Sequence, residues 1–344
     1  MGCLNVLSVA YPLLPVSADS TGGAEQILAL LERSLVQRGH RSFVIAANGS
    51  AVSGELIATP AACGDMTEEV RRTAQEVHRI AIQEALKKYE IDLIHFHGLD
   101  FYAYLPECSV PKLVTLHLPL DWYPTDIFQL SGVQFNCVSQ MQAHTAPQQK
   151  RVFVVPNGID TEKFQADQPH TGPLLWLGRI CPEKGVHLAL QTAHRLNLPL
   201  TVAGPVYAFR THEDYFREQI EPLLDDRRQW IGAVNLKQKI SLLAQARALL
   251  VPSLAAETSS LVAMEAISSG TPVIAFRSGA LPEVVEDGVT GFIAEGQAQM
   301  AEAIERLDEI SPATCRSRAT ARFSAERMTA EYLQLYQKLQ VSAG

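Results

Sequence analysis

Residues 251–275 read VPSLAAETSSLVAMEAISSGTPVIA, and this stretch decides the fold. Apolar runs at 246–251 and 271–276 are typical of buried parallel strands. Between them, residues 261–269 have helical spacing, and Gly270 marks where that helix ends. The pattern therefore predicts a strand, a loop, a helix and a second strand.

The predicted loop and the start of the helix are a candidate anion site. Glu257 follows the first strand, and Ser260, Leu261 and Val262 open the helix. Backbone amides in the first turn have no partner within the helix, and the helix dipole favours an anion there by about 0.3–1 kcal/mol. Glu265 lies one turn further on, within reach of a sugar hydroxyl attached to that anion. Two carboxylates beside a diphosphate site indicate a nucleotide-sugar site, although an isolated pair of acids is more often a solvated surface.

A longer pattern around the two glutamates supports a nucleotide-sugar site rather than a solvated pair of acids. The Glu257 and Glu265 pair, SLVAMEAISSGTPVIA (260–275) and GALPEVVEDGVTGFI (279–293) together resemble the retaining glycosyltransferases of family 4. The resemblance covers nearly the whole chain. It implies an α/β fold of the GT-B type, with two Rossmann-like α/β/α domains facing across a cleft and a C-terminal helix that crosses back to the first domain. It also implies sugar transfer from a nucleotide-diphosphate sugar to an acceptor, with retention at the anomeric carbon.

The same resemblance assigns the two acids to different parts of one ligand. Glu257 is expected to contact the sugar ring and to offset positive charge at the anomeric carbon, whereas Glu265 is expected to bind the ribose. Many family members have an aromatic residue and a glycine where this chain has Ser259 and Ser260. This departure bears on the identity of the donor sugar.

Two cations follow the first predicted strand of the second half, at 173–177. Arg179 and Lys184 lie in GRICPEKGVHLAL (178–190), beside the expected start of a helix. The helix dipole repels cations there, so an anion between them is expected. The motif is similar to the family's G-R-x-x-x-x-K-G, in which the arginine and lysine hold the donor diphosphate.

The segment WIGAV (230–234) is a second motif of this half. It resembles the family's base-binding turn, which would place Val234 against the nucleobase. The alternative is ordinary core packing of Trp230 and Ile231.

The first half begins with a predicted strand at 4–10 and a helix that Gly22 and Gly23 open. Glycines let the backbone approach a ligand closely. By resemblance, this loop faces the donor phosphate and the acceptor. The G-x-G-x-x-G spacing of dehydrogenases is absent from the sequence.

Predicted strands at 91–97 and 112–117 end in histidines. Open α/β sheets bind ligands at the carboxyl ends of their strands, although a lone histidine more often packs in a core. The resemblance implies that His117 contacts the donor sugar near the reacting carbon and that His97 and Gly98 line the acceptor side, while His95 packs. No carboxylate or cysteine joins these histidines at a usual zinc spacing, and no Asp-x-Asp motif occurs. Metal-independent catalysis is therefore expected.

The length and net charge of the chain restrict its domain organisation and the class of its partners. A chain of 344 residues, 47% hydrophobic, favours two domains. We predict an acceptor-side domain at 1–165, a nucleotide-sugar domain at 166–322 that begins with a linker at 166–172, and a final helix at 323–344. The net charge of −8 argues against a nucleic-acid partner.

The cysteines and the amino terminus predict a cytoplasmic protein. Six cysteines are scattered singly, as in a reduced compartment, and are expected to be buried small side chains: Cys3, Cys63, Cys108, Cys137, Cys181 and Cys315. The amino terminus lacks a basic region and enters a strand pattern directly, unlike a signal peptide or a membrane span.

Other functional classes share these features. A sugar-nucleotide epimerase or a phosphorylase could have the same fold, and a non-catalytic sugar-nucleotide-binding protein could have the same donor site. A two-domain solute-binding protein is disfavoured because no signal peptide is found. No cofactor is expected. The expected donor is a UDP- or GDP-sugar, and the acceptor a sugar, a lipid-linked compound or a small molecule. A lipid-linked acceptor would bring peripheral membrane contact.

Overall fold

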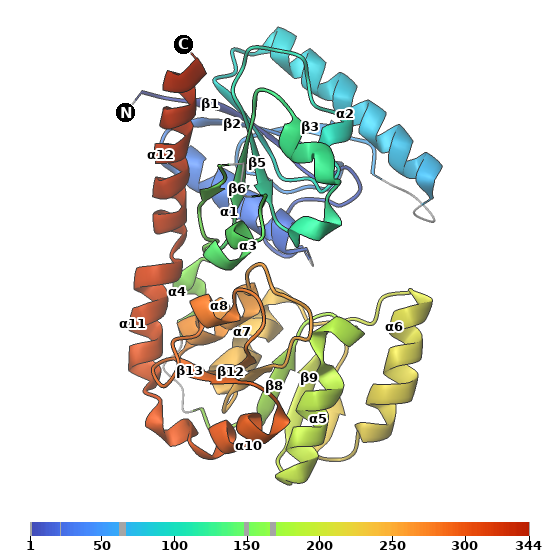
Figure 1. Cartoon of the computed structure of the whole chain (residues 1–344), viewed down its shortest axis with the longest axis vertical. Coiled ribbons are helices and arrows are strands. Elements are labelled where there is room, and N and C mark those ends of the chain that lie inside the picture. Colours follow the sequence, from blue (N-terminus) through green and yellow to red (C-terminus); the bar gives the residue numbers. More distant parts are fainter. Residues whose placement is uncertain (1, 21, 62–66, 148–150, 166–169, 344) are drawn as a thin grey trace. The chain divides into compact units, whose positions relative to one another are not determined.

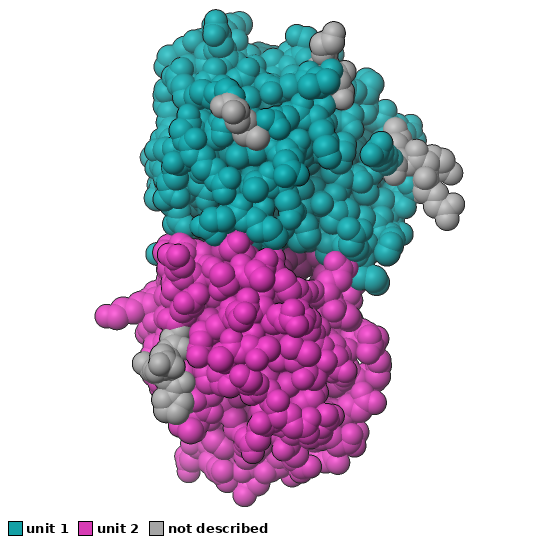
Figure 2. Space-filling view, turned by 90° about the vertical axis from the view of Figure 1, so that its left-hand side faces the viewer, with its two compact units in different colours: residues 1–158, 325–344 teal, residues 159–324 magenta. Residues whose placement is uncertain are grey.

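The computed structural model describes residues 2–20, 22–61, 67–147, 151–165 and 170–343. The chain forms two compact units, one of Met1–Gly158 with Ala325–Gly344 and one of Ile159–Ser324 (Figure 2). The predicted linker at 166–172 lies partly outside the described residues, and the domain boundaries stay a prediction. Within the described ranges, no helix has both the length and the hydrophobicity needed to cross a bilayer.

Unit 1 is built on a parallel seven-stranded sheet in the order β3-β2-β1-β4-β5-β6-β7. The strands are mostly buried apolar runs, as both faces of a parallel sheet require. They are β1 Asn5–Val9, β2 Arg41–Ala47, β3 Glu55–Thr59, β4 Leu93–Phe96, β5 Lys112–Leu116, β6 Val133–Cys137 and β7 Phe153–Val154. The helices are α1 Gly23–Gln37, α2 Glu68–Lys88, α3 Gln140–His144 and α12 Ala325–Ala343, with short turns at Phe101–Ala103, Leu120–Trp122 and Thr125–Gln129.

The last helix, α12, packs against α1 of unit 1, which confirms the expected return of the chain to its first half (Figure 1). Buried polar groups join it to the sheet. The Tyr336 hydroxyl lies 2.8 Å from Nδ1 of His95, and the Tyr332 hydroxyl lies 3.0 Å from Oγ1 of Thr115. Nε2 of His95 lies 2.8 Å from the same Thr115 oxygen, so this histidine is part of the core, as expected.

Unit 2 is built on a parallel six-stranded sheet in the order β10-β9-β8-β11-β12-β13. Its strands are β8 Leu174–Leu177, β9 Leu200–Ala203, β10 Arg228–Trp230, β11 Leu249–Val251, β12 Val273–Phe276 and β13 Gly291–Ala294. Its helices are α4 Thr161–Phe164, α5 Val186–Arg195, α6 Arg210–Tyr215, α7 Leu236–Gln245, α8 Leu261–Ser269, α9 Leu281–Val284, α10 Gln297–Glu305 and α11 Pro312–Phe323. A π-helical segment, Phe216–Ile220, continues α6, and short 3-10 turns lie at Pro182–Lys184, Glu221–Leu223 and Leu307–Glu309.

The stretch at 251–275 forms the predicted unit. β11 leads through a loop into α8, and β12 follows beside β11 in parallel register. Gly270 has a φ of 85°, a left-handed conformation that ends α8 at the predicted position.

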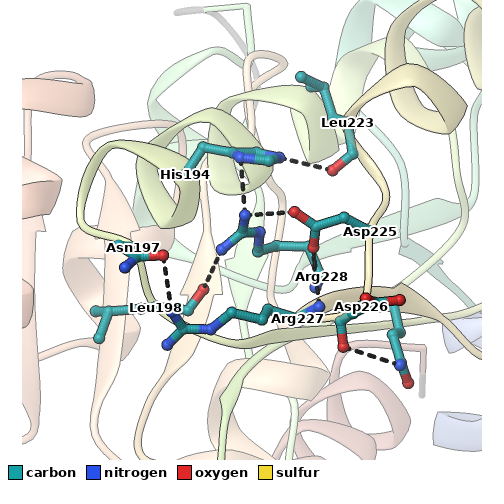
Figure 3. Close-up of polar contacts among 9 residues, drawn as sticks. His194, Asn197, Leu198, Leu223, Asp225, Asp226, Arg227 and Arg228 are labelled. Atoms are coloured by element: carbon teal, nitrogen blue, oxygen red, sulfur yellow. Dashed lines mark hydrogen bonds and ion pairs between the residues drawn. The ribbon is translucent and has the colours of Figure 1, made fainter.

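The edge strand β10 is fixed by a polar cluster, which Figure 3 shows. Arg228, only 6% exposed, donates to the carboxylate of Asp225 and to Nδ1 of His194 at 3.1 Å. Since arginine only donates, Nδ1 of His194 must accept, and its Nε2–H then donates to the carbonyl of Leu223 at 2.8 Å. The cluster stabilises the strand that leads into the turn at 231–235.

The cysteines are only partly as expected. Cys137, Cys181 and Cys315 are buried, but Cys3 is exposed and Cys108 is partly exposed, so the expectation was wrong for these two. Cys63 lies outside the described residues. All five described cysteines are free thiols.

Candidate functional site

The candidate site of unit 2 lies where the strand order of its sheet reverses, between β8 and β11. Ligands of open α/β sheets bind at such a point, outside the carboxyl ends of the strands. The loops that follow the two strands touch directly, because the backbone N–H of Leu254 donates to the carbonyl of Glu183 at 2.8 Å. Gly185 has a φ of 64°, and a Cβ there would collide with the carbonyl oxygen of Pro252. Glycine is therefore required for this close approach.

This contact brings together two predicted site residues that are 73 positions apart. Nζ of Lys184 lies 2.5 Å from Oε1 of Glu257, and the hydroxyl of Ser253 donates to the same oxygen at 2.5 Å. The Lys184 side chain is 32% exposed and that of Glu257 11%. Lys184, predicted to bind the diphosphate, and Glu257, predicted to contact the sugar, thus form an ion pair with each other.

The loop backbone around Glu257 is also held firmly. The N–H of Ala280 donates to the carbonyl of Glu257 at 2.7 Å. Gly279, with a φ of 53°, packs so closely that a Cβ would collide with the Glu257 backbone. The carboxylate of Glu257 is therefore presented from a rigid loop.

The amino terminus of α8 follows this loop. Ser260 is its buried N-cap residue, and its side chain makes no capping hydrogen bond. The N–H of Met264 donates to the carbonyl of Ser260 at 3.1 Å and begins the helical pattern. The amides that open the helix, at Leu261 and Val262, precede that first bond, as the anion-site prediction requires.

Glu265 lies in the second turn of α8 and is only 3% exposed. Its Oε1 accepts from Nζ of Lys239, on α7, at 2.5 Å. Its Oε2 is buried and has no hydrogen-bond partner among the described residues. Burial raises the pKa of this carboxyl, and the neighbouring Lys239 opposes that rise. One oxygen of this buried carboxylate therefore has no hydrogen-bond partner among the described residues.

Arg179 is exposed in the loop after β8. Its guanidinium lies 5.7 Å from the centre of the Tyr207 ring, in the range of a cation–π contact. This cation–π contact keeps the positive charge of Arg179 beside the turn after β8 that contains Lys184.

The predicted base-binding turn follows β10. Val234 is partly exposed there, and Gly204 donates from its backbone to the carbonyl of Gly232 at 2.7 Å. Trp230 and Ile231 are 36% and 45% exposed, so the alternative of core packing for these two side chains was wrong.

In unit 1, the strand order reverses between β1 and β4. Gly22 is the N-cap of α1, which begins at Gly23 as predicted. A Cβ at Gly22 would meet the carboxylate of Glu25, which is 6% exposed and whose pKa is raised by burial. The residue before Gly22 lies outside the described ranges.

The two predicted site histidines of unit 1 contact each other. Nδ1 of His97 lies 3.0 Å from Nε2 of His117, so one ring donates and the other accepts. Burial lowers the pKa of His117 to about 4 and that of His97 well below its usual value, which keeps both rings neutral at pH 7. Gly98 follows, and a Cβ there would collide with the Tyr104 hydroxyl.

Sequence reasoning missed three side chains of the site: Ser253, Lys239 and Tyr207. Ser253 contacts Glu257 within one loop, four positions away, whereas Lys239 and Tyr207 contact predicted residues 26 and 28 positions away. Only Lys239 had a usable signal, because a lysine on the helix that precedes an acid-bearing helix is a candidate ion-pair partner.

Comparisons with known proteins follow the same division of the chain. Residues 159–322 match the model of "Glycosyl transferases group 1", and residues 21–163 match that of "Glycosyltransferase Family 4". A glycogen synthase from Mycobacterium tuberculosis is 34% identical over 194 residues, which are 53% of this chain and 45% of that protein. The chain thus spans about half the length of the curated relatives it matches.

Solved structures resemble the whole chain. A sucrose-phosphate synthase from Thermosynechococcus elongatus has a TM-score of 0.79 at 19% identity, covering 98% of this chain and 100% of that one. The Anabaena protein HepE, in complex with UDP-glucose, has a TM-score of 0.73 at 16% identity, covering 97% and 100%. At these identities, the likeness establishes the fold.

Proposed function

The chain belongs to the family 4, group 1 glycosyl transferases and has the GT-B fold, and we propose that it transfers a sugar from a nucleotide-diphosphate sugar to an acceptor with retention at the anomeric carbon. The observation that carries this proposal is the cluster at the β8/β11 switch point. Lys184, Glu257 and the amino terminus of α8 meet there, with Glu265 in the next turn.

The diphosphate would replace Glu257 as the partner of Lys184. Lys184, Arg179 and the amides at 260–262 would then stabilise the charge that develops on the leaving nucleoside diphosphate. Hydrogen-bond donors placed in this way each stabilise the transition state by about 3–4 kcal/mol in other enzymes. We propose that these groups suffice without a divalent cation in catalysis.

Once released from Lys184, Glu257 would face the sugar. Its backbone is fixed by Ala280 and Gly279, so the carboxylate could contact the ring hydroxyls and offset positive charge at the anomeric carbon. Glu265 would bind the ribose through its unpartnered Oε2, with Val234 against the base. On the unit 1 side we propose that Gly22, Gly23 and His117 serve the donor, and His97 and Gly98 the acceptor.

A donor screen followed by turnover tests this proposal. Thermal shifts with UDP-, GDP- and ADP-sugars identify the donor, because a ligand at 100 times its Kd stabilises by about 2.7 kcal/mol. UDP-glucose is the first donor to test, because HepE was solved with it. The donor is then incubated, in EDTA, with sugars, lipid-linked sugars and small-molecule acceptors.

The outcomes separate the alternatives. Nucleoside diphosphate release together with a glycosylated product supports a transferase, and persistence in EDTA supports metal independence. Formation of an epimer from the donor alone would identify an epimerase. Binding without transfer or hydrolysis would identify a non-catalytic binder, and a shift by NAD but by none of the sugar nucleotides would refute the proposal.

A further inference from the structure

A second cluster of reactive side chains lies beside the proposed donor site. Sγ of Cys181, a carboxylate oxygen of Glu183 and a ring nitrogen of His212 all lie within 4.8 Å of one another. Cys181 and Glu183 flank Pro182 in the turn after β8, and His212 comes from α6. The proposed transfer reaction uses none of the three.

The chemistry of this cluster fits a transition metal. Thiolate, imidazole and carboxylate are the three ligand types that Zn²⁺ takes, whereas Mg²⁺ and Ca²⁺ select oxygen ligands alone. Zinc bonds of about 2.0–2.3 Å place tetrahedral ligand atoms about 3.3–3.8 Å apart, so the cluster needs only a small contraction. Among the described residues, Nδ1 of His212 is buried without a hydrogen-bond partner.

We propose that Cys181, Glu183 and His212 bind one Zn²⁺ ion, with water in the fourth position. The Cys181 thiol loses its proton to solvent when it binds the metal, and the histidine binds as the neutral ring. The ion would link the turn after β8 to α6. This site lies outside the proposed catalytic groups, so the ion would act on donor binding indirectly.

Each of the two linked segments has a neighbour among the residues predicted to bind the diphosphate. The Tyr207 ring under the Arg179 guanidinium stacks on the His212 ring, with the two planes 26° apart. In the turn after β8, the carbonyl of Cys181 accepts from the backbone N–H of Lys184 at 3.1 Å. A metal ion at Cys181 and His212 would therefore restrict the positions of Arg179 and Lys184, the two residues predicted to bind the diphosphate.

The direction of the effect follows from charge. Without metal, the cluster carries one negative charge, on Glu183. With Zn²⁺, the thiolate and the carboxylate together balance the ion, and the cluster is neutral. Removal of one negative charge beside Arg179 should tighten binding of a sugar-nucleotide diphosphate, by about two- to tenfold in Kd at moderate salt. This coupling, unlike the metal site itself, rests on the proposed function.

Zinc binding is tested directly on the full chain. The protein is stripped with EDTA, dialysed, and titrated with Zn²⁺ against a chromophoric chelator, and bound metal is measured by mass spectrometry. One ion per chain is expected, and Co²⁺ should give the thiolate charge-transfer and tetrahedral d–d bands of a cysteine-bound ion. Stoichiometry well below one, or a Co²⁺ spectrum without a thiolate band, overturns the site.

Variants assign the ligands. Cys181→Ser and Glu183→Gln should each weaken Zn²⁺ binding at least tenfold, whereas the control Cys108→Ser, which also alters a thiol, should leave it unchanged. Glu183 is exposed, so its variant keeps the test open if Cys181→Ser fails to fold. Full zinc affinity in folded Glu183→Gln or Cys181→Ser overturns the assignment.

A second titration measures the coupling. Calorimetry of UDP-glucose or the donor found by screening is run with the stripped protein and with one equivalent of Zn²⁺. A tighter Kd in the wild type and no change in Glu183→Gln support the coupling, and an equal Kd with zinc bound overturns it. Failure of every sugar nucleotide to bind would refute the proposed function, while the metal titration would still decide the zinc site.

Discussion

Replacement of Glu265 by glutamine should weaken binding of the free nucleotide, because this glutamate is proposed to bind the ribose. Its Oε2 is buried and unpartnered among the described residues, and its Oε1 pairs with Lys239. A carboxylate accepts stronger hydrogen bonds from hydroxyls than an amide does. The change should therefore cost about 1–2 kcal/mol of binding free energy, or about 5- to 30-fold in the Kd for UDP or GDP.

Glu257→Gln is the matched control. Both glutamates are paired with a lysine at 2.5 Å, so both variants lose a similar ion pair. Free UDP or GDP has the ribose but no sugar, so Glu257→Gln should nearly keep nucleotide affinity and lose mainly kcat. Glu265→Gln should also lose about 1–3 kcal/mol of unfolding free energy, because the partly buried Lys239 keeps only an amide oxygen as its partner.

Calorimetry of UDP and GDP with both variants decides between the two roles. The measurement is made at a temperature where circular dichroism shows both variants to be folded. Tighter nucleotide binding by Glu265→Gln than by Glu257→Gln would refute the assignment. Equal losses in both variants would indicate that both acids are structural.

Three further predictions follow from the charged and buried groups. Arg179→Ala and Lys184→Ala should each weaken donor binding about tenfold or more, and Lys184→Arg should keep only part of the wild-type affinity. Wild-type turnover at limiting donor in either alanine variant would contradict the diphosphate role. His78 is buried, and burial lowers its pKa to about 4, so the unfolded state binds a proton at this residue that the folded state excludes between about pH 6.5 and 4. This residue should lower the unfolding free energy by up to about 3 kcal/mol as pH drops through this window. Urea titrations of His78→Leu should show a smaller slope than the wild type, and the slope that remains comes from other buried histidines such as His97 and His117. Arg228→Met should cost about 1–3 kcal/mol because it removes the centre of the cluster that holds β10, and an unchanged urea midpoint would refute that role.

The elements that sequence reasoning predicted are those with strong local signals. Helix α8 was predicted to the residue because its apolar spacing ends at Gly270, where the chain needs a left-handed residue. The strand predicted at 112–117 is β5, Lys112–Leu116, one residue shorter than predicted. The edge strand β10 was missed because it has only three residues, RQW, two of them polar, and because it depends on the distant His194 for its anchor.

The candidate site was likewise predicted only where the sequence had a local signal. Lys184 and Glu257 were both candidates from their motifs, but the sequence contains nothing that predicts their direct ion pair, because it depends on the contact between the β8 and β11 loops. The pairing of Lys239 with Glu265 likewise depends on how α7 packs against α8. Motifs therefore named the residues, whereas their partners required the tertiary structure.

Proton NMR of a complete reaction tests the central proposal most directly. Wild-type protein is incubated in EDTA with an α-linked donor selected by the thermal screen and with its acceptor, alongside Glu257→Gln. The account predicts release of nucleoside diphosphate, a product whose anomeric proton has the coupling of an α-linkage, and strongly reduced turnover by the variant. A β-linked product, or wild-type turnover by Glu257→Gln, would contradict it.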